Sequence, residues 1–219
     1  NIVKDLMLYF EFDNLDEFVK VLIENPFLIS NKSSTLNQNA NLISDYMQVD
    51  RQTFNKIGHD NSLLFTVKPG ITIDRYKSLK SFLKLSNDDL NSVIQRNARV
   101  LMTKPETIKE NIVDAANYME MSVDSYINLA VVNPRLFTSK RYYIENNVEK
   151  NSEIISVNVE DYKIAARDYE GLLSFSSSSF SEKKAQLCER LNYDDLKMKE
   201  LFLANPRITG VKPEVIEEN

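Results

Sequence analysis

Five lysines recur at a constant spacing of 36 residues, and this row is the clearest candidate for chemistry in the chain. The row consists of Lys32, Lys68, Lys104, Lys140 and Lys212, with Ser176 at the one position that breaks it. Each lysine precedes a predicted helix. A lysine beside the exposed N–H groups and the positive dipole end of a helix forms an anion site. In a stacked array the row becomes one stripe, so it predicts contacts to the phosphates of a nucleic acid.

A second basic row lies five positions before the lysines. It consists of Arg99, Arg135 and Arg207, whereas Phe27, Leu63 and Gly171 stand at the remaining positions. The guanidinium group suits bidentate contacts to phosphate. However, repeats that descend from one ancestral unit share residues without selection for binding, and a lysine in an exposed loop is usually only solvated. Two interpretations of both rows therefore stay open, a phosphate-binding track and ordinary solvated surface.

The single histidine and the single cysteine predict structural roles. His59 has no second His, Cys or Ser-bearing motif with which to form a catalytic set. Cys188 lies on an apolar helical face, where a buried, inert thiol is the usual case. One Cys and one His also exclude an internal disulfide and a His-rich metal site.

Two pairs of neighbouring carboxylates could suggest acid–base catalysis. Asp88-Asp89 and Asp194-Asp195 both fall at the start of a predicted helix, where acids complement the helix dipole. Adjacent residues on a helix do not face each other, which argues against a catalytic pair. The chain also has no Walker loop, no GxGxxG and no HExxH. We therefore expect no enzyme, no cofactor and no metal site.

The elements that must position the basic rows repeat with the same period. The corner Asn-Pro-x-Leu at Asn25 recurs at Asn133 and Asn205, at multiples of 36 residues. Counting in steps of 36 residues from Asn25, an aliphatic side chain stands three positions after every step. These are Leu28, Leu64, Val100, Leu136, Leu172 and Ile208. Six unrelated segments would not keep one register, so the chain is predicted to be an array of repeats.

Each repeat encodes two helices. The second helix starts after a good N-cap residue, in the order Asn14, Asp50, Ser86, Ser122, Asn158 and Asp194. Its expected buried face carries Phe18, Phe54, Leu90, Tyr126, Tyr162 and Met198. The first helix carries an apolar i, i+3, i+4 stripe, as at Ile43, Tyr46 and Met47. A pair this short cannot bury its own stripe, so the sequence predicts an all-α solenoid of about six 36-residue repeats.

The predicted repeats belong to a single helical-repeat domain that spans 1–219. Their approximate limits are 1–29, 30–65, 66–101, 102–137, 138–173 and 174–209. The fifth repeat is the most degenerate, because Tyr169 replaces the corner Asn and Asn151 falls at a core position. The run from Ser174 to Ser179 is expected to be a looser loop with a local bend, and a functional hinge is the alternative.

This pattern resembles the mitochondrial transcription termination factor (mTERF) family. The similar segments are LIENPFLIS, HDNSLLFT, QRNARVLMT, VVNPRLFTS and LANPRITG, and the resemblance covers nearly the whole chain. It implies a right-handed solenoid whose repeats each have two α-helices and a short 3-10 corner. It also implies binding of DNA or RNA along a basic concave path, in organelle transcription or ribosome biogenesis. Where that family often ends the first helix with Gly, this chain has Met47-Gln48, Lys84-Leu85 and Met119-Glu120.

Composition and charge supply an alternative function. The chain is 42% hydrophobic and 27% charged, which is typical of globular proteins. Its net charge is −5, and the first 110 residues hold 14 basic and 14 acidic side chains, so the whole excess lies in the remainder. Nucleic-acid binding would need basic residues gathered on one face. An acidic array also suits a protein–protein interaction scaffold that holds a partner in its concave face.

The remaining expectations concern the setting of the protein. No apolar run approaches the roughly 18 residues that span a bilayer, so we expect no membrane partner. We also expect a monomer without a small-molecule substrate. No signal peptide is visible, and the sequence starts at Asn1 rather than Met, so a leader or another domain can precede it. The expected compartment is an organelle for an mTERF relative and the cytoplasm for a bacterial protein.

Overall fold

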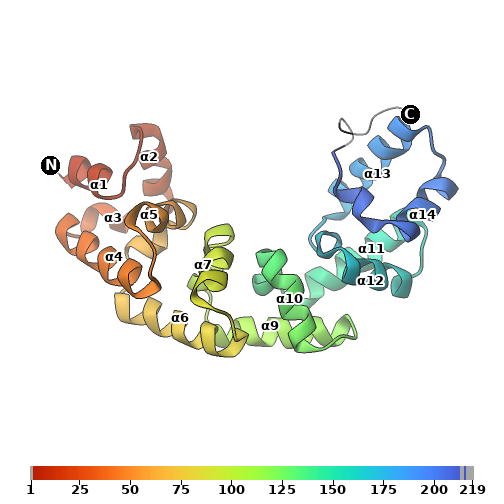
Figure 1. The fold of residues 1–219 in the computed structure, drawn as a ribbon. Helices are drawn as coiled ribbons and strands as arrows, with labels where there is room; N and C mark the ends of the chain where they lie inside the picture. The colour runs from red at the N-terminus through yellow and green to blue at the C-terminus, as the bar shows by residue number, and fades with distance from the viewer. Residues whose placement is uncertain (1, 213–214, 216–219) are drawn as a thin grey trace. The chain divides into compact units, whose positions relative to one another are not determined.

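The computed structural model describes residues 2–212 and 215, which form α-helices and 3-10 turns and contain no strand (Figure 1). This confirms the all-α prediction. The chain packs as two compact units, Asn1–Lys109 and Glu110–Asn219. The boundary falls inside α9 (Pro105–Tyr118). In the described part of the chain, no helix has the length and apolar character needed to cross a membrane.

In the first unit, pairs of helices alternate with short corner elements. They are α1 (Ile2–Tyr9), α2 (Leu15–Glu24), α3 (Phe27–Ser30), α4 (Ser33–Met47), α5 (Arg51–Asp60), η1 (Ser62–Phe65), α6 (Pro69–Leu83), α7 (Asn87–Arg96) and α8 (Arg99–Met102). The longer helices α4 and α6 pack against each other, and the shorter helices α5 and α7 do the same. The first unit therefore has a layer of long helices and a layer of short ones.

The second unit continues the same succession of elements. They are α10 (Val123–Val132), η2 (Pro134–Thr138), α11 (Arg141–Ile155), α12 (Val159–Asp168), η3 (Glu170–Leu173), α13 (Ser177–Leu191), α14 (Asp195–Ala204) and η4 (Pro206–Gly210). Here the long helices α11 and α13 pack together, and each short helix packs on the corner element that follows it.

The short helices begin at regular intervals because their caps do. They are α2, α5, α7, α10, α12 and α14, which start at Leu15, Arg51, Asn87, Val123, Val159 and Asp195, and each has ten residues. In every one, the side chain of the preceding residue accepts a hydrogen bond from the backbone N–H three positions on. For example, Asn14 Oδ1 accepts from Glu17 N at 2.8 Å and Asp50 Oδ1 accepts from Thr53 N at 2.7 Å. All six predicted N-caps are confirmed.

The predicted core face of the short helices is confirmed as well. Its members, Phe18, Phe54, Leu90, Tyr126, Tyr162 and Met198, are at most 1% exposed. One core prediction for the long helices is wrong, since Tyr46 is 40% exposed. Its ring instead lies edge-on to Tyr76, with the centroids 6.0 Å apart, and Lys77 Nζ lies 5.3 Å from its centroid. A phenol can cover a neighbour while its hydroxyl stays in water, which the apolar stripe alone does not reveal.

The corner asparagines connect one corner element to the next. Asn25 is buried, and its Nδ2 donates to Ser62 O at 2.8 Å and to Thr66 Oγ1 at 3.0 Å. Asn133 Nδ2 makes the equivalent bond to Ser174 Oγ at 3.0 Å. Residue 66 lies 41 positions after Asn25, and residue 174 lies 41 after Asn133. The sequence identified these asparagines as corner residues, and the structure adds that they join neighbouring corners.

Tyr169 stands at a corner where the other repeats have asparagine, and nearby glycines make room for its ring. Gly210 stands 41 positions after Tyr169, where Thr66 and Ser174 serve the other corners. A Cβ at Gly210 would collide with the Tyr169 ring, and so would one at Gly171. Two side chains are therefore missing where one large ring is added, and the corner keeps its backbone bond from Leu172 N to Tyr169 O at 3.1 Å.

The second half of the serine run is helical, so the expectation of a loose loop is wrong for residues 177–179. The helix α13 begins at Ser177, and Ser176 Oγ accepts from Ser179 N at 3.2 Å as its N-cap. Serine favours this position because its hydroxyl satisfies an N–H of the first turn. Asn151 is fully buried, and its Nδ2 donates to Phe175 O at 3.0 Å, which fixes the segment just before the helix.

The long helices end in a left-handed residue that is never glycine. These residues are Gln48, Lys84, Glu120, Ser156 and Asn192, with φ between 51° and 60°. A Cβ in this conformation costs roughly 1 kcal/mol. We therefore expect Ser156→Gly to raise the free energy of unfolding by about 0.5–1 kcal/mol in urea denaturation. Ser156→Ala, which keeps the Cβ, should give no such gain, and equal stability of the two variants would contradict the argument.

Candidate nucleic-acid interface

The structure places the predicted lysines at the junctions where a corner leads into a long helix. Lys32, Lys68 and Lys140 are the N-cap residues of α4, α6 and α11. Lys104 immediately precedes α9, and Lys212 follows η4. All five side chains are exposed. The first unit thus holds three of the lysines and the second unit holds two.

These junctions lack the side-chain caps that the short helices have. At Lys32, Lys68 and Lys140 no side chain accepts a hydrogen bond from the first turn, because lysine has no acceptor. Losing a cap costs a helix about 1 kcal/mol, and a cation at the positive dipole end costs a further few tenths. The long helix α13, in contrast, has a side-chain cap at this position, from Ser176. The lysine row therefore runs against local helix stability.

The surroundings of Lys104 combine both signs of charge. Lys104 lines a shallow surface hollow together with Asp74, Arg75 and Glu106. Arg75 Nη1 in turn donates to Met102 O at 2.8 Å, which holds α6 against the end of α8. An anion at this junction would meet two cations and two carboxylates. Lys104 therefore offers a weaker site than a lysine without such acidic neighbours.

The predicted arginines begin the corner elements. Arg99 is the first residue of α8, and Arg135 and Arg207 are the second residues of η2 and η4. All three are exposed. Arg207 already has a structural partner, since its Nη2 donates to Asp168 O at 3.0 Å and its guanidinium lies 6.0 Å from the centroid of the Tyr169 ring. Of the three, Arg207 thus has the clearest packing role.

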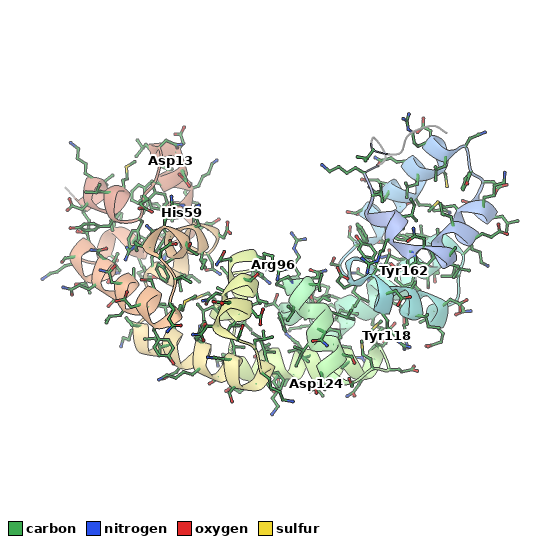
Figure 2. All side chains as sticks on the ribbon, viewed as in Figure 1. Asp13, His59, Arg96, Tyr118, Asp124 and Tyr162 are labelled. Carbon is green, nitrogen blue, oxygen red and sulfur yellow. The ribbon has the colours of Figure 1, made fainter. Side chains whose placement is uncertain are left out.

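His59 has the structural role expected from the sequence (Figure 2). Its Nε2 lies 2.8 Å from Phe10 O, and its Nδ1 lies 3.2 Å from Glu17 Oε1. The imidazole stacks on the Phe12 ring at a centroid distance of 4.3 Å. The side chain therefore ties α5 to the first two helices of its unit.

The cysteine and the acid pairs are structural too. Cys188 is half-buried rather than buried as predicted, because its side of α13 is only partly covered, and burial raises the pKa of its thiol. Asp89 accepts a hydrogen bond from Ser86 Oγ at 2.6 Å, while Asp194 caps α14. Asp195 pairs with Lys184 Nζ at 2.6 Å. The contacts of Asp89, Asp194 and Asp195 are thus with a helix start or with a lysine.

Sequence reasoning missed Lys163, whose side chain is only 7% exposed. Its Nζ donates to Glu160 Oε1 at 2.8 Å and to Glu120 Oε1 at 3.1 Å, and it lies 4.7 Å from the centroid of the Tyr118 ring. Burial alone would lower the pKa of Lys163, but the two carboxylates outweigh it and raise the pKa above the ordinary value. Glu160 stands three residues before Lys163 on the same helix, so this ion pair could have been predicted from the spacing. Glu120 is 43 residues away, so its contact could not.

Among the residues the structure describes, no group of three or more His, Cys, Asp or Glu side chains could hold a metal ion. No family model and no curated protein matches the chain.

Proposed function

We propose that this chain is a nucleic-acid-binding helical-repeat protein of the mTERF-like type, which binds DNA or RNA in the regulation of transcription or in RNA metabolism. In this proposal six repeats stack into a right-handed solenoid. In it, the five lysines of the row contact phosphates. Four of them do so at the junctions before long helices, and the last does so in the equivalent place after η4. The five are Lys32, Lys68, Lys104, Lys140 and Lys212. Arg99, Arg135 and Arg207 assist from the corner elements.

The observation that carries the proposal is the contrast between the two kinds of helix start. Every short helix begins with a capping side chain, whereas four of the five lysines stand directly before a long helix, at a position that serine or aspartate would stabilise. A residue type that recurs against local stability points to another role. An exposed ammonium beside a helix start that has no side-chain cap is suited to an anion, and a row of such sites suits a polyanion.

A salt titration tests the proposal. We would measure fluorescence anisotropy of labelled duplex DNA and single-stranded RNA across a range of salt concentrations. Five neutralised phosphates predict a log–log slope of about −4.5 on duplex DNA. Replacing Lys68, Lys104 and Lys140 with serine removes three charges and should bring the slope to about −1.8.

The serine variant carries its own control for folding. Serine caps a helix, so each replacement at Lys68 and Lys140 should raise the free energy of unfolding by about 0.5–1 kcal/mol. Lower affinity in a more stable protein could not come from misfolding. Lys20, Lys56 and Lys150 are exposed lysines outside the row, and replacing them with serine makes the matched control. Absence of binding at low salt, or equal losses in both triple variants, would refute the lysine track.

The charge balance favours a second candidate, a protein–protein interaction scaffold. The net charge is −5, and Lys104 shares its surface hollow with Asp74 and Glu106. Both features weaken attraction to a polyanion. In this case the wild-type protein should retain a protein partner in affinity capture, and the retention should be unchanged by nuclease treatment and by the lysine-to-serine replacements.

A further inference from the structure

Two adjacent tyrosines in the first turn of α11 lie on the surface of the second unit. Tyr142 is 54% exposed and Tyr143 is 53% exposed, and their rings contact each other with the centroids 3.9 Å apart. A side-chain hydrogen bond with Tyr143 raises the pKa of Tyr142. The two rings therefore form one aromatic surface, which is called the tyrosine pair below.

The tyrosine pair belongs to this long helix alone. The equivalent positions at the starts of the other long helices hold no aromatic residue, and they read Ser34-Thr35, Gly70-Ile71, Glu106-Thr107 and Ser178-Ser179. A residue that repeats share by common descent recurs at its position, as the lysine row does. Common descent therefore does not explain the pair, and tyrosine is a residue type that is enriched at binding interfaces.

Two cations stand at the same junction as the tyrosine pair. Lys140 directly precedes α11 and Arg135 lies in η2, and both side chains are exposed. The corner folds back on itself, because Arg135 O accepts a hydrogen bond from Ser139 Oγ at 3.0 Å, and Ser139 is followed directly by Lys140. Aromatic surface and positive charge thus occupy one junction of the second unit.

The third cation of this junction, Arg141, has a structural role. Its Nε lies 3.3 Å from Glu145 Oε2, and its guanidinium lies 5.7 Å from the centroid of the Tyr118 ring. These contacts connect the start of α11 to the end of α9, and they neutralise the carboxylate of Glu145. The cations that we assign to a ligand are therefore Lys140 and Arg135.

At this junction a ring takes the place of a carboxylate. Two positions after Lys104 stands Glu106, which lines the hollow there, whereas Tyr142 stands two positions after Lys140. A carboxylate repels a phosphate, while an aromatic ring offers its face to a base. The junction at Lys140 is therefore better suited than the one at Lys104 to a nucleic acid whose bases are accessible.

We infer that the tyrosine pair stacks on unpaired bases of a single-stranded nucleic acid, whose phosphates contact Lys140 and Arg135. This inference rests on the proposed function and names a single strand as the ligand. In a duplex the neighbouring bases cover both faces of each base, so a side chain stacks on a base only where it is unpaired. Every base has such a face, so stacking does not distinguish RNA from DNA.

Salt titrations separate stacking from charge. Tyr142→Ala/Tyr143→Ala should lower the affinity for oligouridine and for oligothymidine about 5- to 150-fold, which is the effect of losing one stacked base. The double variant removes no charge, so its log–log slope against salt should equal that of the wild type, whereas the lysine-to-serine replacements change the slope. Tyr142→Phe/Tyr143→Phe keeps both rings and should bind as the wild type does. Tyr193→Ala, at a 37% exposed tyrosine of the same unit, is the matched control and should also bind as the wild type does.

A tryptophan in the pair reports the stacking directly. The chain has no tryptophan, so Tyr142→Trp introduces a single indole fluorophore. Stacking on a base quenches indole fluorescence. The emission of this variant should fall when oligouridine or oligothymidine is added, and it should not change when duplex DNA is added.

The outcomes distinguish this inference from the proposed function. If the wild type binds duplex DNA with the expected salt slope, but the double alanine variant binds single strands as tightly as the wild type, the lysine track stands and base stacking is wrong. Equal losses of affinity for duplex and single strand would also overturn the stacking, because the rings cannot stack on paired bases. Absence of binding to every probe at low salt would overturn both proposals.

Discussion

Asn91→Leu is expected to lower the free energy of unfolding by about 2–4 kcal/mol. Asn91 is 5% exposed, and its amide satisfies two buried groups. Its Nδ2 donates to Met47 O at 2.8 Å, and its Oδ1 accepts from Tyr76 Oη at 3.0 Å. Leucine would leave the carbonyl without its donor, and the hydroxyl would keep only a long contact to Asn87 O at 3.5 Å. Urea denaturation followed by circular dichroism measures the loss.

A double variant separates the two hydrogen bonds. Tyr76→Phe removes the hydroxyl that Asn91→Leu would leave unpaired, so the two changes together should cost less than the sum of their separate costs. Strict additivity would show that the Tyr76–Asn91 bond contributes nothing to stability. Asn91→Gln, which keeps both donor and acceptor on a longer side chain, serves as the control for the change of shape.

The same tyrosine predicts a loss of stability in alkali. Burial, helped by the nearby Tyr46 and Asp88, raises the pKa of Tyr76 to about 12. Between the ordinary pKa of 10 and 12, the unfolded chain has lost this proton while the folded protein keeps it, so unfolding is favoured as the pH rises. The contribution is fully present below pH 10 and is lost through pH 12. In Tyr76→Phe, this part of the pH dependence should be missing.

Gly58→Ala is expected to lower the free energy of unfolding by about 1–3 kcal/mol. Gly58 lies in the last turn of α5, where alanine would by propensity alone gain up to about 1 kcal/mol. However, an added Cβ would collide with three ring atoms of Phe65. That ring cannot withdraw easily, because it packs against Phe10 at a centroid distance of 4.1 Å and against Phe54 at 6.4 Å. Steric overlap therefore outweighs helix propensity.

A matched glycine distinguishes overlap from propensity. Gly70 lies in α6 with nothing within 4 Å of its Cβ position, so Gly70→Ala should leave stability unchanged or raise it by up to about 1 kcal/mol. Phe65→Leu replaces the ring with a smaller side chain. In the double variant it should therefore relieve part of the loss of stability caused by Gly58→Ala. If both glycine variants were equally stable, the contact with Phe65 would have no energetic role.

The local features of the fold were predictable because they are coded within a few residues. An N-cap requires one side chain and the N–H three positions later, so all six starts of the short helices could be assigned from Asn14 onward. The core face follows from helical spacing and was correct for Phe18 and its equivalents. The prediction for the serine run was wrong from Ser177 onward for a local reason too. Ser176 is itself a capping residue, so it marks the start of a helix and not a loop.

The basic rows could be located from the sequence, but their surroundings could not. Spacing alone put Lys32, Lys68 and Lys140 before helices, and they lie there. That Lys104 shares a hollow with Asp74, and that Arg207 binds Asp168 O, depends on chain segments about 30 to 40 residues apart. A single sequence does not encode which exposed charges will be neighbours, since small changes in helix packing decide it.

The sequence by itself determined the starts, the caps, the length and the core face of the short helices. These follow from hydrogen bonds and apolar spacing within one or two turns. Only the tertiary structure decided what each helix end meets, as with Asn91 at Met47 O and Lys163 between Glu120 and Glu160. The contacts of Asn91 with Met47 and of Lys163 with Glu120 join residues 44 and 43 positions apart, so they exist only once the helix pairs have packed.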